Sequence, residues 1–103
     1  MARHMQYHRA SSHGESIRSW LRALRSINVR LAPEILAEFH GAAAGQWDVS
    51  WHGERGNRYF DIREYATGRQ QAFIARAKDP LSIVRLRQGI TDFILDEDFT
   101  DGE

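Results

Sequence analysis

Residues 47–77 read WDVSWHGERGNRYFDIREYATGRQQAFIARA, and their pattern decides the fold. Apolar and polar side chains alternate through residues 47–52, 58–65 and 71–77, which is typical of strands buried on one face. Between these runs, residues 53–57 and Thr67-Gly68 favour tight turns. Because connections this short join antiparallel neighbours, the stretch predicts a three-stranded antiparallel meander.

Helices are predicted on both sides of this meander. Residues 12–27 carry apolar side chains at helical spacing, with Ser12 and Glu15 matching a capping box and Asn28 as the stop. The apolar positions are Ile17, Trp20, Leu21, Leu24 and Ile27. A shorter helix is predicted from Pro33, with Ile35, Leu36 and Phe39 as its buried face and the glycines at 41 and 45 at its end.

The last helix is predicted after Asp79-Pro80, with Asp79 as the N-cap and Pro80 in the first turn. Its apolar stripe is Ile83, Leu86, Ile90, Phe93 and Ile94. Gly89 lies inside this helix, where glycine costs about 1 kcal/mol relative to alanine. We therefore expect a close approach between the helix and the sheet at Gly89.

The predicted fold class is α+β, a two-layer sandwich in the order α-α-β-β-β-α with the meander packed against the helices. Residues 12–95 would form a single domain, between a flexible N-terminal tail (1–11) and an acidic C-terminal tail (96–103). His4-Met5 matches the remnant of a common cloning site, so one interpretation is that part of the N-terminal tail derives from a vector.

The formal charge is zero, but charges of opposite sign are separated along the chain. Residues 1–31 hold six arginines and one acid, whereas residues 92–103 hold six acids and no base. A neutral chain has no general attraction for nucleic acid or anionic lipid, so any such binding would be local. This separation favours a docking role over a catalytic one.

Composition excludes several classes of site. The chain has no cysteine, which rules out disulfides, thiolate nucleophiles and cysteine-based zinc sites. No apolar run reaches the roughly 18–20 residues that span a bilayer. We expect a cytoplasmic protein of a bacterium or phage that uses no cofactor, binds no metal and contacts no membrane.

Candidate catalytic residues are few. Asp48, Ser50 and His52 share one face of a predicted strand, but side chains two apart on a strand lie about 6.5–7 Å from each other. A nucleophile and its base need about 2.6–3.2 Å, so these three cannot form a relay among themselves. His40 at a helix end is another candidate base, although a histidine there also suits the helix dipole. We therefore expect no enzyme activity.

Two surfaces are candidates for binding. One is an arginine stripe on the helix over 12–27, formed by Arg18, Arg22 and Arg25. The other is the exposed sheet face, where aromatic and arginine side chains are predicted together: Tyr59, Arg63, Tyr65 and Arg76, with Arg55, Arg58 and Arg69 at the hairpin tips. Such side chains anchor protein partners, and they also stack bases and bind phosphates.

The first hypothesis is a small non-enzymatic protein that works by protein–protein contact as an adaptor, regulator or inhibitor. Under this hypothesis the acidic tail provides a second contact surface for the partner, or it pairs with the basic helix over 12–27 of another copy in a homodimer. The alternative is a nucleic-acid-binding module that uses both surfaces, with the tail as an internal phosphate mimic. A weaker alternative is a small ribonuclease of the toxin type, with His52 or His40 as its base.

Overall fold

The computed structural model describes the backbone of residues 5–8 and 13–95 and the side chains of residues 16–95. The predicted order α-α-β-β-β-α is confirmed over residues 13–95. The elements are α1 (His13–Ser26), α2 (Pro33–Leu36), β2 (Trp47–Glu54), β3 (Asn57–Glu64), β4 (Gln70–Ala75) and α3 (Pro80–Leu95), with 3₁₀ turns η1 (Ala37–Phe39) and η2 (Gly41–Gln46) after α2.

The meander gains a fourth strand at its edge. β1 (Met5–His8) pairs antiparallel with the end of β2, with Tyr7 opposite His52 in the register, so the strand order is β1-β2-β3-β4. No strand within residues 1–11 was predicted from the sequence. The pairing explains the difference: a free strand edge offers unpaired backbone groups to any nearby segment, whatever its hydrophobic pattern.

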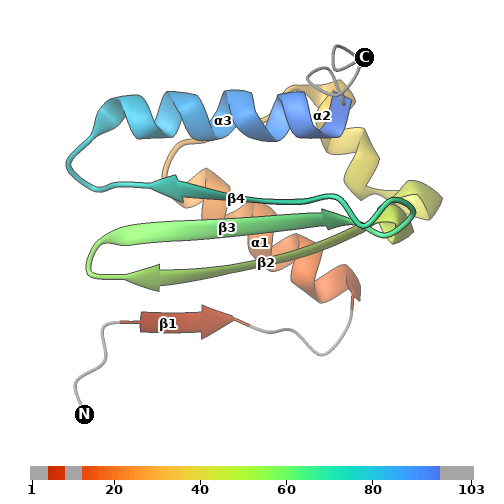
Figure 1. Cartoon of the computed structure of the whole chain (residues 1–103), viewed down its shortest axis with the longest axis horizontal. Coiled ribbons are helices and arrows are strands. Elements are labelled where there is room, and N and C mark those ends of the chain that lie inside the picture. Colours follow the sequence, from red (N-terminus) through yellow and green to blue (C-terminus); the bar gives the residue numbers. More distant parts are fainter. Residues whose placement is uncertain (1–4, 9–12, 96–103) are drawn as a thin grey trace.

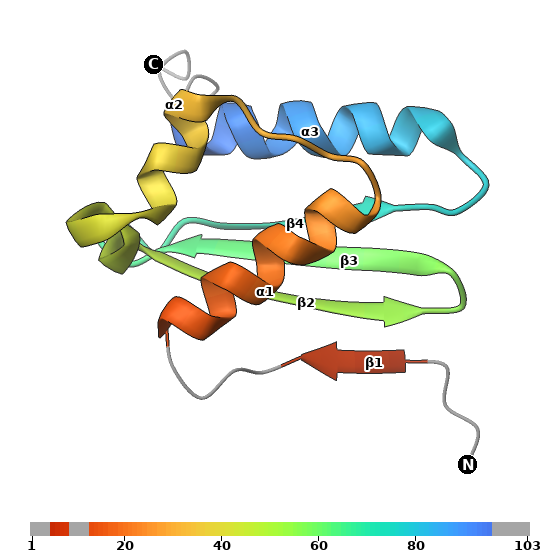
Figure 2. The same cartoon turned by 180° about the vertical axis from the view of Figure 1, so that it is seen from behind.

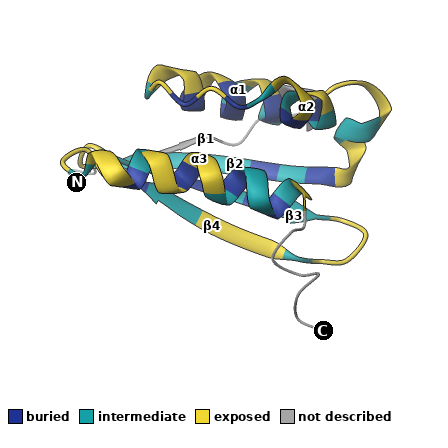
Figure 3. Cartoon of the chain, turned by 90° about the horizontal axis from the view of Figure 1, so that it is seen from above, coloured by how far each residue is buried: buried dark blue, intermediate teal, exposed yellow. Residues whose placement is uncertain are grey.

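The helices cover one face of the sheet and leave the other open. In Figure 1 α1 crosses behind β2 and β3, and in Figure 2 the same helix lies in front of them, while α3 runs beside β4 in both views. Figure 3 shows the buried residues facing the space between the helices and the sheet. The core there includes Trp20 of α1, Phe60 and Ile62 of β3, and Ile90 of α3. The predicted two-layer arrangement is thus confirmed.

Tryptophan side chains attach α1 to β2. The indole N–H of Trp20 donates to the carbonyl of Ser50 at 3.1 Å, and Trp51 Nε1 donates to Ser19 Oγ at 2.9 Å. The ring of Trp20 also meets that of Phe60 edge-on, with centroids 6.0 Å apart. These contacts fix α1 across the sheet and leave its opposite side to solvent.

Helix α1 ends where the sequence predicts. Asn28 adopts the left-handed conformation (φ 67°) and donates its backbone N–H to the carbonyl of Arg25 at 2.9 Å. The N–H of Val29 donates to the carbonyl of Leu24 at 2.9 Å, which completes a Schellman motif. The proposed capping contact of Ser12 and Glu15 lies outside the residues whose side chains are described.

The second helix is shorter than expected. The α-helix ends at Leu36, and tighter 3₁₀ turns continue to Gln46. Ile35 and Phe39 are buried as predicted, and Gly41 has a positive φ (63°) that favours glycine. The change of helix type still places Phe39 against Trp20, with ring centroids 5.5 Å apart.

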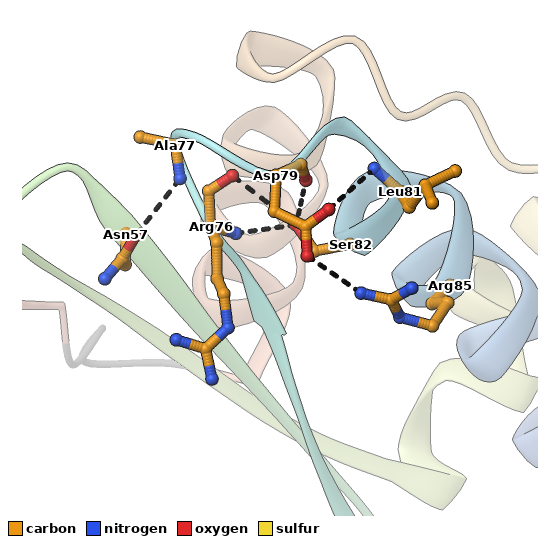
Figure 4. A network of polar contacts seen from close by, with 7 residues as sticks. All are labelled: Asn57, Arg76, Ala77, Asp79, Leu81, Ser82 and Arg85. Atoms are coloured by element: carbon orange, nitrogen blue, oxygen red, sulfur yellow. Dashed lines mark hydrogen bonds and ion pairs between the residues drawn. The ribbon is translucent and has the colours of Figure 1, made fainter.

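A polar network joins the end of β4 to the start of α3 (Figure 4). The carboxylate of Asp79 accepts from the backbone N–H of Leu81 at 3.2 Å and pairs with Arg85 at 2.9 Å, so the predicted N-cap is confirmed. The buried Ser82 hydroxyl donates to the Asp79 carbonyl at 2.6 Å and accepts from the backbone N–H of Arg76 at 2.8 Å. The network orients α3 on the sheet.

Gly89 marks the expected close approach of α3 to the sheet. A Cβ atom at this position would lie 2.5 Å from Cε1 and 2.9 Å from Cδ1 of Phe73 in β4. The absence of a side chain at 89 therefore lets the ring of Phe73 lie directly against the helix.

Candidate functional site

The described helices leave one face of the sheet uncovered (Figure 1). By strand alternation it carries Asp48, Ser50, His52 and Glu54 of β2, Tyr59, Asp61 and Arg63 of β3, and Gln70, Ala72 and Ile74 of β4. Most of these side chains are half-buried by their neighbours, whereas Gln70 and Ala72 are exposed. The predicted Tyr59 and Arg63 therefore do lie on one surface.

An aromatic pair lies on this face, toward the β2–β3 turn. The rings of His52 and Tyr59, opposite each other in the β2–β3 register, stack with centroids 4.7 Å apart and an interplanar angle of 9°. They border a groove of about 200 Å³ that Ser50, Asp61 and Ala72 also line. The groove thus combines flat apolar surface with a hydroxyl and a carboxylate.

A second group lies toward the other end of β3. Arg63 Nη2 is 3.5 Å from Asp48 Oδ2 across the strands, and Arg63 Cζ is 4.8 Å from the ring centre of Tyr65. Tyr65 is 48% exposed and lies just beyond the end of β3. Arg63 and Tyr65 are thus brought together as predicted, but Arg63 has a carboxylate partner already.

The charges on the open face do not favour phosphate. Asp48, Glu54 and Asp61 share the face with one arginine, Arg63. Asp61 forms no ion pair with any residue that the structure describes. Arg76 is exposed and lies one residue past the end of β4, at the turn into α3 (Figure 4). The face is therefore acidic rather than basic.

Arg58 does not belong to the open face, which corrects its expected place at a hairpin tip. Its guanidinium donates to the carbonyl of Ala23 at 3.2 Å and to the hydroxyl of Ser26, and lies 5.3 Å from the Trp51 ring centre. A cation at this place satisfies a carbonyl at the C-terminal end of α1 and complements the helix dipole. Alternation could have revealed this, since Arg58 lies two residues before the buried Phe60.

Arg69 is also a structural residue. It forms an ion pair with Glu64 at 2.8 Å, donates to the carbonyl of Phe93 at 3.2 Å and lies 4.2 Å from the Phe93 ring centre. Both side chains of the ion pair are largely buried, with 15% and 19% exposed. The pair joins the β3–β4 turn to the end of α3, so only Arg55 of the three hairpin-tip arginines is exposed.

Helix α1, which carries the arginine stripe, lies on the side of the sheet opposite the open face (Figures 1 and 2). Arg18, Arg22 and Arg25 are all exposed, as predicted, and form no ion pair with the described residues. The two candidate surfaces therefore do not combine into one, and a single ligand would have to wrap around the domain to contact both.

The candidate catalytic residues are not assembled into a relay. Within residues 16–95 no hydrogen bond joins Asp48, Ser50 and His52, whose partners differ, and His40 is exposed beyond η1. In the same part of the chain no cluster of three His, Asp or Glu side chains could hold a metal ion. Among the described helices none is long and apolar enough to cross a membrane.

No family model matches this chain, and no curated protein or solved structure is significantly similar to it.

Proposed function

We propose that this chain is a small non-enzymatic binding protein, an adaptor, regulator or inhibitor, that contacts a protein partner through the open face of its sheet. The observation that carries the proposal is the stacked pair of His52 and Tyr59 beside a groove on a face that no described helix covers. Tyrosine is among the residues that contribute most to protein interfaces, because it supplies rigid contact area and a hydroxyl.

The charge of the face favours a protein over a nucleic acid. Its acids outnumber its single arginine, and that arginine is paired with Asp48. Carboxylates repel phosphates, whereas they complement lysine and arginine on a protein surface. We therefore expect a partner with a basic contact surface and an apolar residue that enters the groove.

A photo-crosslinking amino acid at position 74 tests the proposal in the native cell. Ile74 lies on the open face opposite Tyr59 in the register, whereas Gln88 is exposed on α3 and provides the matched control position. The proposal expects a discrete protein adduct from position 74, none from position 88, and loss of the adduct in Tyr59→Ala.

Three results would contradict the proposal. These are no adduct at position 74, equal adducts at both positions, or adducts at position 74 that nuclease treatment removes. Gel-shift titrations with RNA and DNA at two salt concentrations provide an independent check, because binding to phosphates weakens steeply with salt. Salt-sensitive binding that Tyr59→Ala or a charge change at Arg63 reduces would assign the face to nucleic acid instead.

A further inference from the structure

A groove of about 270 Å³ lies on the helical side of the molecule, between α1 and the segment that leads into α2. Its apolar lining comes from Leu21, Leu24, Val29, Leu31 and Leu36. Arg25 and Arg30 also line it, both are exposed, and no acidic residue contributes. The groove thus combines an aliphatic surface with two cations.

The positive charge around this groove is not neutralised by the described part of the chain. Neither Arg25 nor Arg30 forms an ion pair with a described residue. Arg22 lies one turn before Arg25 on the same exposed side of α1, and Arg87 of α3 donates to the carbonyl of Arg30 at 2.8 Å. An occupant of complementary chemistry would carry several carboxylates and one bulky apolar group.

The chain contains a segment with this composition. Residues 96–103 read DEDFTDGE, with five acids around one large apolar side chain, Phe99. Helix α3 ends at Leu95, and this end of the helix lies at the same end of the molecule as α2 (Figures 1 and 3). Leu36 of α2 lines the groove.

The length of the segment is also compatible with this contact. Eight extended residues span at most about 26–29 Å, and the two shorter dimensions of the molecule are 32 and 24 Å. Because α3 and the groove both lie on the helical side of the sheet, the segment need not cross the sheet to enter the groove.

We propose that residues 96–103 bind in this groove of the same molecule, with Phe99 against the leucines and the carboxylates beside Arg25 and Arg30. The bound segment covers the basic side of α1 and competes with any anionic partner for it. This contact does not depend on the proposed function, because the open sheet face lies on the other side of the domain.

Paramagnetic relaxation enhancement in the full-length chain tests the contact. Since the chain has no cysteine, Gly102→Cys provides a single site for a nitroxide and keeps all five carboxylates. The methyl signals of Leu21, Val29 and Leu36 are expected to broaden, whereas the backbone signal of Gly56 at the β2–β3 turn is not. At 1 M salt, where screening acts within about 3 Å, the broadening should largely disappear.

Charge and anchor variants give the matched controls. Arg25→Glu with Arg30→Glu, or Phe99→Ala, should abolish the broadening, whereas Arg55→Glu changes one exposed charge at the β2–β3 turn and should not. The proposal is overturned if the methyl signals of the labelled chain stay sharp. It is also overturned if they broaden only when labelled and unlabelled molecules are mixed, because the occupant is then the segment of a second copy.

Discussion

The substitution Gly89→Ala separates helix propensity from helix–sheet packing. In an exposed helix interior, alanine would stabilise the chain by about 1 kcal/mol over glycine. At position 89, however, the new Cβ would lie 2.5 Å from Cε1 of Phe73, far inside the about 3.5–4.0 Å at which carbon atoms attract each other. Overpacking of this kind costs about 1–3 kcal/mol, so we expect the free energy of unfolding to stay level or fall by up to about 2 kcal/mol.

A double-mutant cycle with Phe73→Ala makes this test decisive. Without the ring the clash is gone, so Gly89→Ala should raise the free energy of unfolding by about 1 kcal/mol in that background. Urea denaturation followed by circular dichroism would measure all four chains. If Gly89→Ala stabilises both backgrounds by the same amount, the inferred close approach of α3 to β4 is refuted.

Three further predictions concern single contacts and can be measured by the same denaturation assay. The indole N–H of Trp20 donates to a strand carbonyl, whereas that of Trp47 is buried without a hydrogen-bond partner among the described residues. Trp20→Phe should therefore lower the free energy of unfolding by about 1–3 kcal/mol more than Trp47→Phe does. Equal losses would argue against the hydrogen bond to the strand. Because Asn28 has φ 67°, Asn28→Ala should lower the free energy of unfolding by about 1–2 kcal/mol, whereas Asn28→Gly should change it little or not at all. An alanine variant as stable as the original chain would contradict the left-handed conformation of residue 28. Arg58→Met should lower the free energy of unfolding by about 1–3 kcal/mol, because it removes the donor to the end of α1. Arg55→Met at the exposed turn should change it by less than about 0.5 kcal/mol. Similar losses in the two variants would contradict the structural role of Arg58.

Regular elements were predictable where local chemistry and hydrophobic period agree. Asp79 and Pro80 specify the start of α3, and Asn28 specifies the end of α1, because each acts on backbone groups within a few residues. Gly89 was also informative, since a glycine inside an amphipathic helix needs a packing reason. These features depend on the nearest neighbours in the sequence, and the structure confirms them.

Features that depend on tertiary context were not predictable in the same way. β1 forms because the edge of β2 is free, and four residues carry too short a pattern to indicate a strand. Arg58 and Glu64 are polar but lie on the helical face, where each finds a partner on another element or a turn. Strict alternation from Phe60 and Ile62 would have placed Arg58 and Glu64 on the helical face, although their charge alone indicates a solvent-exposed position.

The candidate site was predictable in part. Tyr59, Arg63 and Tyr65 were predicted to lie together. In the structure Arg63 lies over the ring of Tyr65, and Tyr59 is on the same sheet face as Arg63. The stacking of His52 on Tyr59 was not predicted, because it depends on which residues lie opposite each other in β2 and β3. That register is set by the geometry of the turn between the strands, which was not defined from the sequence. Arg76 and the arginines of α1 were assigned correctly as exposed.

The pairing of β1 with β2 has a practical consequence for handling the protein. Residues Met5–His8 cover the backbone of Trp51–Glu54, so trimming the N-terminus past them would expose a strand edge next to the aromatic pair. Such an edge recruits strands from other molecules and promotes domain swapping or aggregation. Truncations that remove Met5–His8 would thus change the association state of the preparation without altering any residue of the helices or the meander.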